Sequence, residues 1–284
     1  MNLVGQTEQR TGISDVYSRN AQAADATAAP AILQQRAQDT EWWVRQTVAS
    51  NTNCPSETLA QLAQDPDELV RRAAASNVRC PPDILVRLLQ DPAVPVQDAA
   101  AGNASCPPAA LDRLRTKSAR RATVYSAIAN PNCPPGLLAW ASRVLRPDND
   151  HQRTIAAHPA CPPATLETLS NSEGGGPLAD IRSNVASNLS CPPSILERLS
   201  RDERPGVRQA VAGNPASPAG ALEQLCKHGG SNILGTVASN KSCPVPLLER
   251  LLRHKDPYVA KAARDNPSLP RHLRAMYQLA HGTD

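Results

Sequence analysis

The stretch Val70–Leu88, which reads VRRAAASNVRCPPDILVRL, is one copy of a unit that recurs along the chain. Each copy has a run of small residues, an Asn, two variable residues, Cys-Pro and then leucines. Successive cysteines are separated by 26, 26, 27, 28, 30 and 52 residues, and Ser217 stands in the cysteine position midway through the last gap. The repeated cysteines are Cys54, Cys80, Cys106, Cys133, Cys161, Cys191 and Cys243. A fixed period of this length predicts a solenoid.

The residues that follow Cys-Pro predict a short helix in each unit. Leu59 lies five residues after its cysteine, and Leu62 follows three residues later. Apolar residues three apart lie on one face of a helix. Proline is favoured at the first helical position, because the N–H that it lacks would have no partner there. We therefore expect each proline to start a helix.

The residues before the Asn predict a second short helix. Val44 and Val48 are four residues apart, which again places them on one helical face. Aspartates precede this helix in five units, where an N-cap residue is expected. They are Asp39, Asp65, Asp91, Asp202 and Asp256. The Asn is expected to end the helix, since it tolerates the left-handed conformation.

Two short helices per unit predict an all-α fold without a sheet. We expect an α-solenoid of about nine two-helix repeats, each of 26–30 residues, with some 3₁₀ turns. Residues 1–27 are polar and Ala-rich without periodicity, which predicts a flexible N-terminal tail. Residues 28–284 are then the solenoid, with capping half-repeats at both ends.

The unit resembles the leucine-rich repeat variant family. The pattern that carries the resemblance is nearly complete in Val44–Leu62 and Val207–Leu225, and it extends over roughly residues 28–277. The resemblance implies a right-handed solenoid of alternating α and 3₁₀ or short α-helices, related in architecture to HEAT and armadillo arrays. Some family members carry an N-terminal four-cysteine iron–sulfur segment. This chain has no cysteine before Cys54, so no such cluster is expected.

Two polar positions recur from unit to unit. An Asn that is repeated in every unit but one favours a structural ladder, in which its amide satisfies backbone groups of the turn. Arg45, Arg71, Arg182 and Arg208 hold equivalent positions before that Asn. One interpretation is that each Arg bridges to an Asp of its own or the next unit. The other is that the row of arginines binds an acidic partner.

The position after this Arg varies in charge, size and aromaticity, as a recognition surface requires. We predict a non-enzymatic scaffold that binds a protein or peptide with this variable face of the second helix. The candidate partner-binding residues are Gln46, Arg72, Tyr125, Arg153, Gln209 and Lys261. The alternative function is nucleic-acid binding. It would use Arg72, Arg120, Arg121, Arg153 and Lys261, and it would weaken steeply with salt.

A run of cations between two units also permits two interpretations. Its members are Arg115, Lys117, Arg120 and Arg121. A solvated loop is one interpretation, and a phosphate-binding segment is the other.

The sequence contains no pattern typical of catalysis or metal binding. The cysteines form no close pairs, and the histidines lack ligand spacing. We therefore expect no catalytic residue, no metal and no cofactor. The repeated cysteines are expected to be reduced and buried, with the off-register Cys226 the most reactive. The net charge of +4 neither excludes nor demands a nucleic-acid partner. The N-terminus lacks a secretory signal and no apolar run approaches 18 residues, so we expect a cytoplasmic protein without a membrane span. We also expect a monomer.

Overall fold

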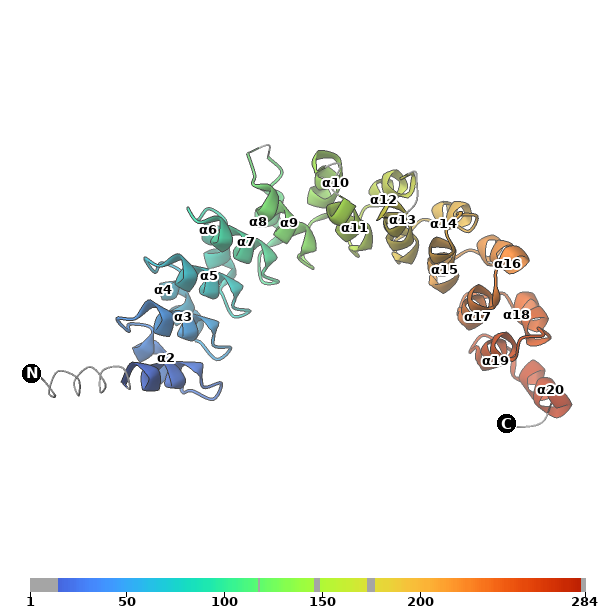
Figure 1. Ribbon diagram of the computed structural model, residues 1–284, viewed down its shortest axis with the longest axis horizontal. Helices are drawn as coiled ribbons and strands as arrows, with labels where there is room; N and C mark the ends of the chain where they lie inside the picture. The colour runs from blue at the N-terminus through green and yellow to red at the C-terminus, as the bar shows by residue number, and fades with distance from the viewer. Residues whose placement is uncertain (1–14, 117, 146–148, 173–176, 282–284) are drawn as a thin grey trace, which may run out of the picture. The chain divides into compact units, whose positions relative to one another are not determined.

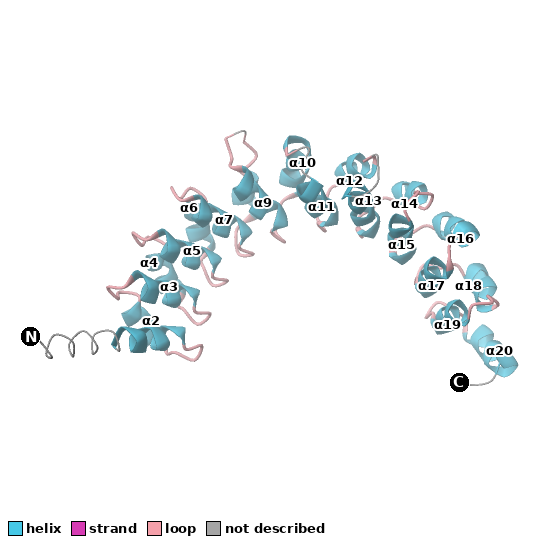
Figure 2. Ribbon diagram, in the orientation of Figure 1, coloured by secondary structure: helices cyan, strands magenta, loops and turns pink. Residues whose placement is uncertain are grey.

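The computed structural model describes residues 15–116, 118–145, 149–172 and 177–281. Every regular element in these ranges is an α-helix, and none is a strand (Figure 2). The all-α fold predicted from the repeat is therefore confirmed. Tighter, 3₁₀-like bonding occurs in the turns that follow the proline-started helices. In one such turn the Asp65 N–H donates to the carbonyl of Leu62 over 3.1 Å.

The chain forms two compact units, residues 1–137 and residues 138–284. In each unit the helices form two layers (Figure 1). We call the layer built from the helices that precede the Asn the Val-Arg layer. In the first unit it contains α3 (Trp42–Ser50), α5 (Glu68–Ser76), α7 (Val94–Gly102) and α9 (Arg121–Ala129). In the second it contains α11 (Asn149–Ala157), α13 (Pro177–Ser187), α15 (Pro205–Gly213), α17 (Ser231–Ser239) and α19 (Pro257–Asp265).

The other layer consists of the helices that follow the proline-rich turn, and we call it the proline-started layer. In the first unit it contains α2 (Pro30–Arg36), α4 (Ser56–Leu62), α6 (Pro82–Leu88) and α8 (Pro108–Asp112). Helix α10 (Pro135–Val144) crosses the boundary between the units. The second unit continues with α12 (Pro163–Ser170), α14 (Pro193–Leu199), α16 (Ala219–His228), α18 (Val245–Leu252) and α20 (Arg271–His281).

The two layers pack differently. Within each unit, neighbouring helices of the Val-Arg layer lie side by side, whereas neighbouring proline-started helices touch little. Small buried residues such as Ala75 and Ala101 let the Val-Arg helices approach closely. The stack inside each unit therefore bends toward the Val-Arg layer.

The core lies between the two layers. The leucines five residues after each cysteine position are fully buried, as the repeat predicts. They are Leu59, Leu85, Leu111, Leu138, Leu166, Leu196, Leu222 and Leu248. Burial of one such side chain stabilises the fold by roughly 1.5–3 kcal/mol. Most of the helices have 7 to 10 residues, which is too short for stability in isolation, so stacking on neighbouring units holds them.

Part of the segment expected to be a flexible tail is helical. Residues 15–24 form a helix in which Ala23 is fully buried, and the Tyr17 ring lies 6.0 Å from the ring of Trp43. Arg19 of this helix bonds Asp39 over 2.9 Å. The described part of the expected tail thus packs on the first regular unit, and residues 1–14 lie outside the described residues.

Candidate functional site

The repeated Asn side chains are fully engaged inside the stack. The Asn77 amide donates to the carbonyls of Ala49 (2.8 Å) and Asn51 (2.9 Å) in the preceding unit. Its oxygen accepts from the Arg79 N–H over 2.9 Å. The same three bonds recur at Asn51, Asn103, Asn130, Asn188, Asn214, Asn240 and Asn266. The predicted structural ladder is confirmed, and these buried amides do not face a partner.

The repeated arginines form a second ladder. Arg45 contacts Asp65 of the next unit through two nitrogens, with Nε 2.6 Å and Nη2 2.9 Å from the carboxylate oxygens. Hydrogen bonding to Asp65 raises the pKa of the Arg45 guanidinium above its already high ordinary value. The equivalent pairs are Arg71–Asp91 and Arg182–Asp202. Three of the four arginines therefore hold the units together, as the first interpretation expected.

The ladder corrects the prediction that the repeated aspartates are N-caps. Asp65 lies two residues before the N-cap of α5, and its Oδ1 accepts from the Asp67 N–H over 2.9 Å. The N-cap itself is Asp67, which accepts from the Leu69 N–H. The prediction is likewise wrong for Asp39, Asp91 and Asp202, and it is right for Asp256. A carboxylate in the preceding turn, rather than at the cap, reaches the arginine of the previous unit.

The candidate partner-binding residues hold equivalent positions in the Val-Arg layer. In the first unit, Arg72 and Tyr125 are exposed and Gln46 is half-buried. In the second unit, Arg153 is exposed and pairs with Asp150 on its own helix, at 3.3 Å. These positions share one face within each unit, and their role in binding stays a prediction.

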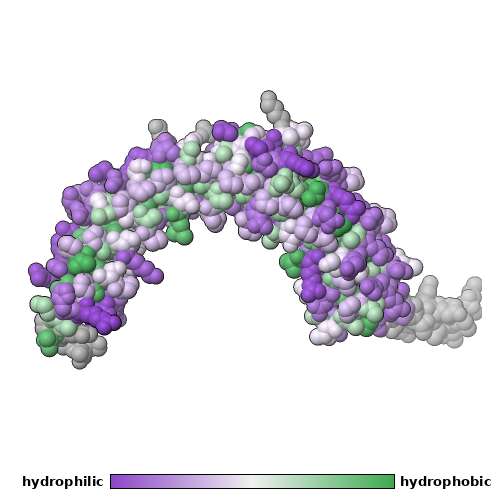
Figure 3. Space-filling model, turned by 180° about the vertical axis from the view of Figure 1, so that it is seen from behind, coloured by the Kyte–Doolittle hydropathy of each residue, from purple (hydrophilic) through white to green (hydrophobic). Residues whose placement is uncertain are grey.

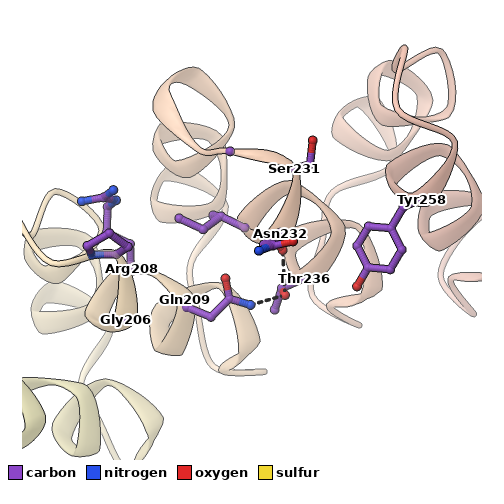
Figure 4. Close-up of a pocket in the computed structure, with 10 residues that line it drawn as sticks. Gly206, Arg208, Gln209, Ser231, Asn232, Thr236 and Tyr258 are labelled. Carbon is purple, nitrogen blue, oxygen red and sulfur yellow. Dashed lines mark hydrogen bonds between the residues drawn. The ribbon is translucent and has the colours of Figure 1, made fainter.

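Two of the predicted residues, Gln209 and Lys261, lie beside pockets on the Val-Arg layer of the second unit. The larger pocket has a volume of ≈ 770 Å³ and lies along α15, α17 and the start of α19 (Figure 4). It is lined by Pro205, Gly206, Arg208, Gln209, Gly230, Ser231, Asn232, Ile233, Thr236 and Tyr258, and we call it the Tyr258 pocket. Lys261 lines a second pocket of ≈ 350 Å³, and Tyr258 lines both. Tyr258, which is 59% exposed, therefore borders both hollows.

Local sequence fixes the position of this ring. A Cβ built on Gly235 would lie 2.2 Å from Cε1 of Tyr258, so the ring lies directly against the backbone of α17. Gln209 on α15 donates a hydrogen bond to the hydroxyl of Thr236 on α17. Hydrogen bonds from the Ser231 hydroxyl and the Tyr258 N–H lower the pKa of Asp256, the residue that caps α19. The Tyr258 ring and the hydrogen-bonded pair Gln209 and Thr236 are thus held in place by contacts between neighbouring repeats.

The described members of the cation run differ in their surroundings. Arg115 pairs with Asp112 at 2.5 Å. Arg120 is the N-cap of α9 and Arg121 its first residue, and both are exposed. Lys117 lies outside the described residues. Phosphate binding by this run stays a prediction.

The eight cysteines carry free thiols. Burial raises the pKa of the Cys106 thiol to about 11 and that of Cys80 to about 12. Ser217, in the cysteine position of its unit, is also buried and donates to the carbonyl of Val211, as expected of a small filler. Cys226 is half-buried, and burial raises the pKa of its thiol also. Over the described ranges, no three His, Cys, Asp or Glu side chains are grouped to hold a metal ion, and no helix has the length and hydropathy to cross a membrane.

Comparison with known proteins supports the sequence pattern. The family model of the leucine-rich repeat variant matches residues 42–67 and 68–93, which are two consecutive units. The chain carries leucine-rich repeat variant repeats. The resemblance seen in the sequence is thereby confirmed, and the asparagine ladder that joins these two repeats recurs between other neighbouring repeats in both compact units.

The chain is also similar to several solved structures. A leucine-rich repeat variant with a novel repetitive structural motif is 23% identical, with a TM-score of 0.49 over 74% of this chain and 81% of that chain. An engineered protein is 18% identical, with a TM-score of 0.42 over 92% of this chain and 94% of its own. A designed armadillo repeat protein in complex with the peptide (KR)4 is 16% identical, with a TM-score of 0.21 over 86% and 97%. No curated protein matches the chain.

The sequence did not single out Tyr258 or Thr236. Neither occupies the variable position. Tyr258 lies near the start of its helix, three residues before Lys261, and Thr236 comes one residue after the variable position of its own helix. The signal that was present is Gly235, the one glycine at the variable position. A glycine there permits the close approach of a ring from the next unit.

Proposed function

We propose that this helical-repeat scaffold binds an extended polypeptide along the Val-Arg layer of residues 138–284, centred on Tyr258. The observation that carries the proposal is the exposed Tyr258 ring, which is fixed against Gly235 and borders two open pockets. An aromatic ring that is already held in place offers contact area at low entropic cost, and tyrosine is enriched among residues that dominate binding energy. A rigid exposed ring is therefore a suitable anchor for a partner side chain.

The composition of the Tyr258 pocket favours a polypeptide. Gln209, Ser231, Asn232 and Thr236 offer side-chain donors and acceptors, which can pair with the main-chain N–H and C=O groups of an extended chain. Both pockets are open hollows on the helix layer rather than enclosed cavities. A small substrate is usually surrounded on most sides, so this geometry suits a longer ligand better.

The charge pattern gives less support to nucleic acid, the alternative function. Affinity for a phosphate backbone comes from several cations that each displace counterions. Arg208 and Lys261 are the cations that line the two pockets. Arg153 is paired with Asp150 on its own helix. On the face drawn in Figure 3, hydrophilic residues predominate and apolar residues are scattered in small patches.

The test is selection of peptides on the full chain from a displayed random library, followed by affinity measurement on purified variants. We expect the selected peptides to lose about tenfold in affinity, about 1.4 kcal/mol, on Tyr258→Ala. The control is Glu249→Ala, an exposed residue on the proline-started helix α18, which should leave affinity unchanged. Failure to select any peptide would refute the proposal, as would equal binding by both variants. Competition by DNA or RNA that weakens steeply with salt would favour the alternative.

A further inference from the structure

The geometry points to a carboxylate-binding subsite at Arg208, which we infer from a break in the arginine ladder. The inference rests on the proposed function only for the identity of the ligand, an acidic group of a polypeptide. The subsite itself rests on how the same side chain behaves in the other units.

Three equivalent arginines show what this position does. Nε and Nη2 of Arg71 donate to the two carboxylate oxygens of Asp91, at 2.8 and 3.0 Å. Nη1 of Arg71 donates to the carbonyls of Asp65 (2.8 Å) and Pro66 (3.0 Å), which fixes the plane of the guanidinium. Arg45 makes the same four bonds. The fold therefore builds a pre-oriented fork that takes one carboxylate in two-point contact.

Arg208 keeps the anchoring half of this arrangement. Its Nη1 donates to the carbonyls of Asp202 (2.7 Å) and Glu203 (3.0 Å), the same two backbone positions that Arg71 uses. Among the described residues, no carboxylate lies within ion-pair distance of its guanidinium. The residue 20 positions later, where each equivalent pair has its aspartate, is His228.

A change in the backbone explains why His228 does not complete the ladder. Helix α14 ends at Leu199, three residues before Asp202, whereas α16 continues to His228. The Gly229 N–H donates to the carbonyl of Leu225 in an α-helical bond of 2.8 Å. His228 is exposed to solvent as a result. The side of the fork that holds an aspartate in other units therefore faces an open pocket.

This pocket has a volume of ≈ 310 Å³ and is formed within the second unit. Besides Arg208, it is lined by Arg201, Gln224 and His228, each of which can donate a hydrogen bond to an anion. The acidic residue in its lining, Asp202, already accepts from Arg182 at 2.6 and 3.2 Å. Arg208 lines both this pocket and the Tyr258 pocket. A polypeptide seated at Tyr258 can thus place an Asp or Glu side chain, or its C-terminal carboxylate, on the fork.

The test measures the arginine Nε–H resonances of the full chain in ¹H–¹⁵N spectra, with Arg208 assigned by its loss in Arg208→Gln. Three peptides are titrated: acetyl-Ala-Ala-Asp-Ala-Ala-amide, its Asn counterpart, and acetylated penta-alanine with a free C-terminus. Arg208→Gln should fold, because Gln97 holds the equivalent position and donates to the carbonyl of Asp91 over 2.6 Å. Arg45, Arg71 and Arg182, which already hold carboxylates, are internal controls in the same spectrum.

We expect a saturable shift of the Arg208 resonance with at least one carboxylate peptide, and the responding peptide identifies the source as a side chain or a chain terminus. The Asn peptide and the three occupied forks should show no change. Absence of any Arg208 shift at millimolar peptide would overturn the inference, and so would equal shifts at Arg45, Arg71 and Arg182. Because the peptides lack an anchor for Tyr258, a failed library selection and a failed Arg208 titration are separate results.

Discussion

Removal of one rung of the asparagine ladder should destabilise the whole array. Asn103 lies in the middle of the first unit and is 6% exposed. Its amide donates to the carbonyls of Ala75 (2.7 Å) and Asn77 (2.8 Å), and its oxygen accepts from the Ser105 N–H (2.8 Å). In Asn103→Ala the Ala75 carbonyl and the Ser105 N–H lose these bonds, and the Asn77 carbonyl keeps only its bond from the Cys80 N–H (2.9 Å), while the methyl group that remains replaces none of the three.

The magnitude follows from the three bonds. A neutral hydrogen bond contributes about 1 kcal/mol net, and a buried group left unpaired costs roughly 1–3 kcal/mol, so the loss should be about 3 kcal/mol in total. The lower end applies if water reaches the freed carbonyls. Each repeat is stabilised by its neighbours, so the loss of these hydrogen bonds weakens the contact between two repeats. It therefore lowers the free energy of unfolding of the stack formed by residues 1–137.

The assay is urea unfolding followed by circular dichroism, and Asn132→Ala is the matched control. Asn132 is exposed, and its amide bonds the carbonyl of Ala104 in the preceding unit over 2.6 Å. Its removal should cost below about 1 kcal/mol, because water replaces the partner. Equal losses in the two variants would refute the view that the buried ladder stabilises the stack.

The described contacts support four further predictions. Arg71→Ala should lower the free energy of unfolding by about 3 kcal/mol, because Asp91 is left buried without its cation. Arg208→Ala should lower it by below about 1 kcal/mol, because Arg208 bonds only backbone carbonyls among the described residues. Thermal and urea unfolding of the two variants will show the difference. Burial raises the pKa of Asp91, but the hydrogen bonds from Arg71 and the Ala93 N–H outweigh burial, so the pKa in the folded state is lowered. The Asp91 carboxylate therefore stabilises the fold above its unfolded pKa, and this contribution is lost as the pH falls through the folded pKa. In Arg71→Ala, acid should reduce the free energy of unfolding by less than in the unchanged protein, as urea unfolding at a series of pH values will show. Gly235→Ala should displace the Tyr258 ring and weaken peptide binding with little change in melting temperature, and an unchanged affinity would separate the ring from binding. A thiol reagent at pH 8 should label the half-buried Cys226 first and the seven buried thiols only after denaturation, because their burial keeps the reagent away as well as raising their pKa values; early labelling of Cys106 would contradict this.

The repeat made most of the fold predictable, because each structural role recurs in register. Leu59 and its equivalents are buried, and Asn77 and its equivalents form the ladder, since one period assigns all copies at once. The arginine ladder was predicted as one of two interpretations, and spacing alone did not choose between them. The predicted N-cap was wrong by two residues at Asp65. The sequence before a helix does not distinguish an aspartate that caps that helix from one that bonds the arginine of the previous repeat.

The candidate site was less predictable, because it depends on contacts between different positions of neighbouring repeats. The variable position led to Gln209 and Lys261, but Tyr258 is at another position of its helix and meets Gly235 only once the units stack. A search for single variable columns does not find such a pair. The packing of residues 15–24 on the first regular repeat was not predicted for a related reason, since this segment lacks the Cys-Pro signature and is held by Arg19, Ala23 and Tyr17.

Four departures from the rule of the repeat lie together in the second unit. The Cys position holds Ser217, the aspartate position holds His228, the arginine position holds Leu234, and the variable position holds Gly235. All four fall within about 20 residues of sequence, around the turn where α16 extends and α17 begins. Each ladder substitution removes a contact between repeats, which costs stability in an array that depends on its neighbours. The Tyr258 pocket and the free side of the Arg208 fork are formed at this same turn. We therefore expect a change that restores the residue type of the other repeats, such as His228→Asp, to keep or raise the free energy of unfolding. The same change should weaken the binding of acidic peptides. A stabilised His228→Asp variant with unchanged peptide affinity would show that the irregular turn has no part in recognition.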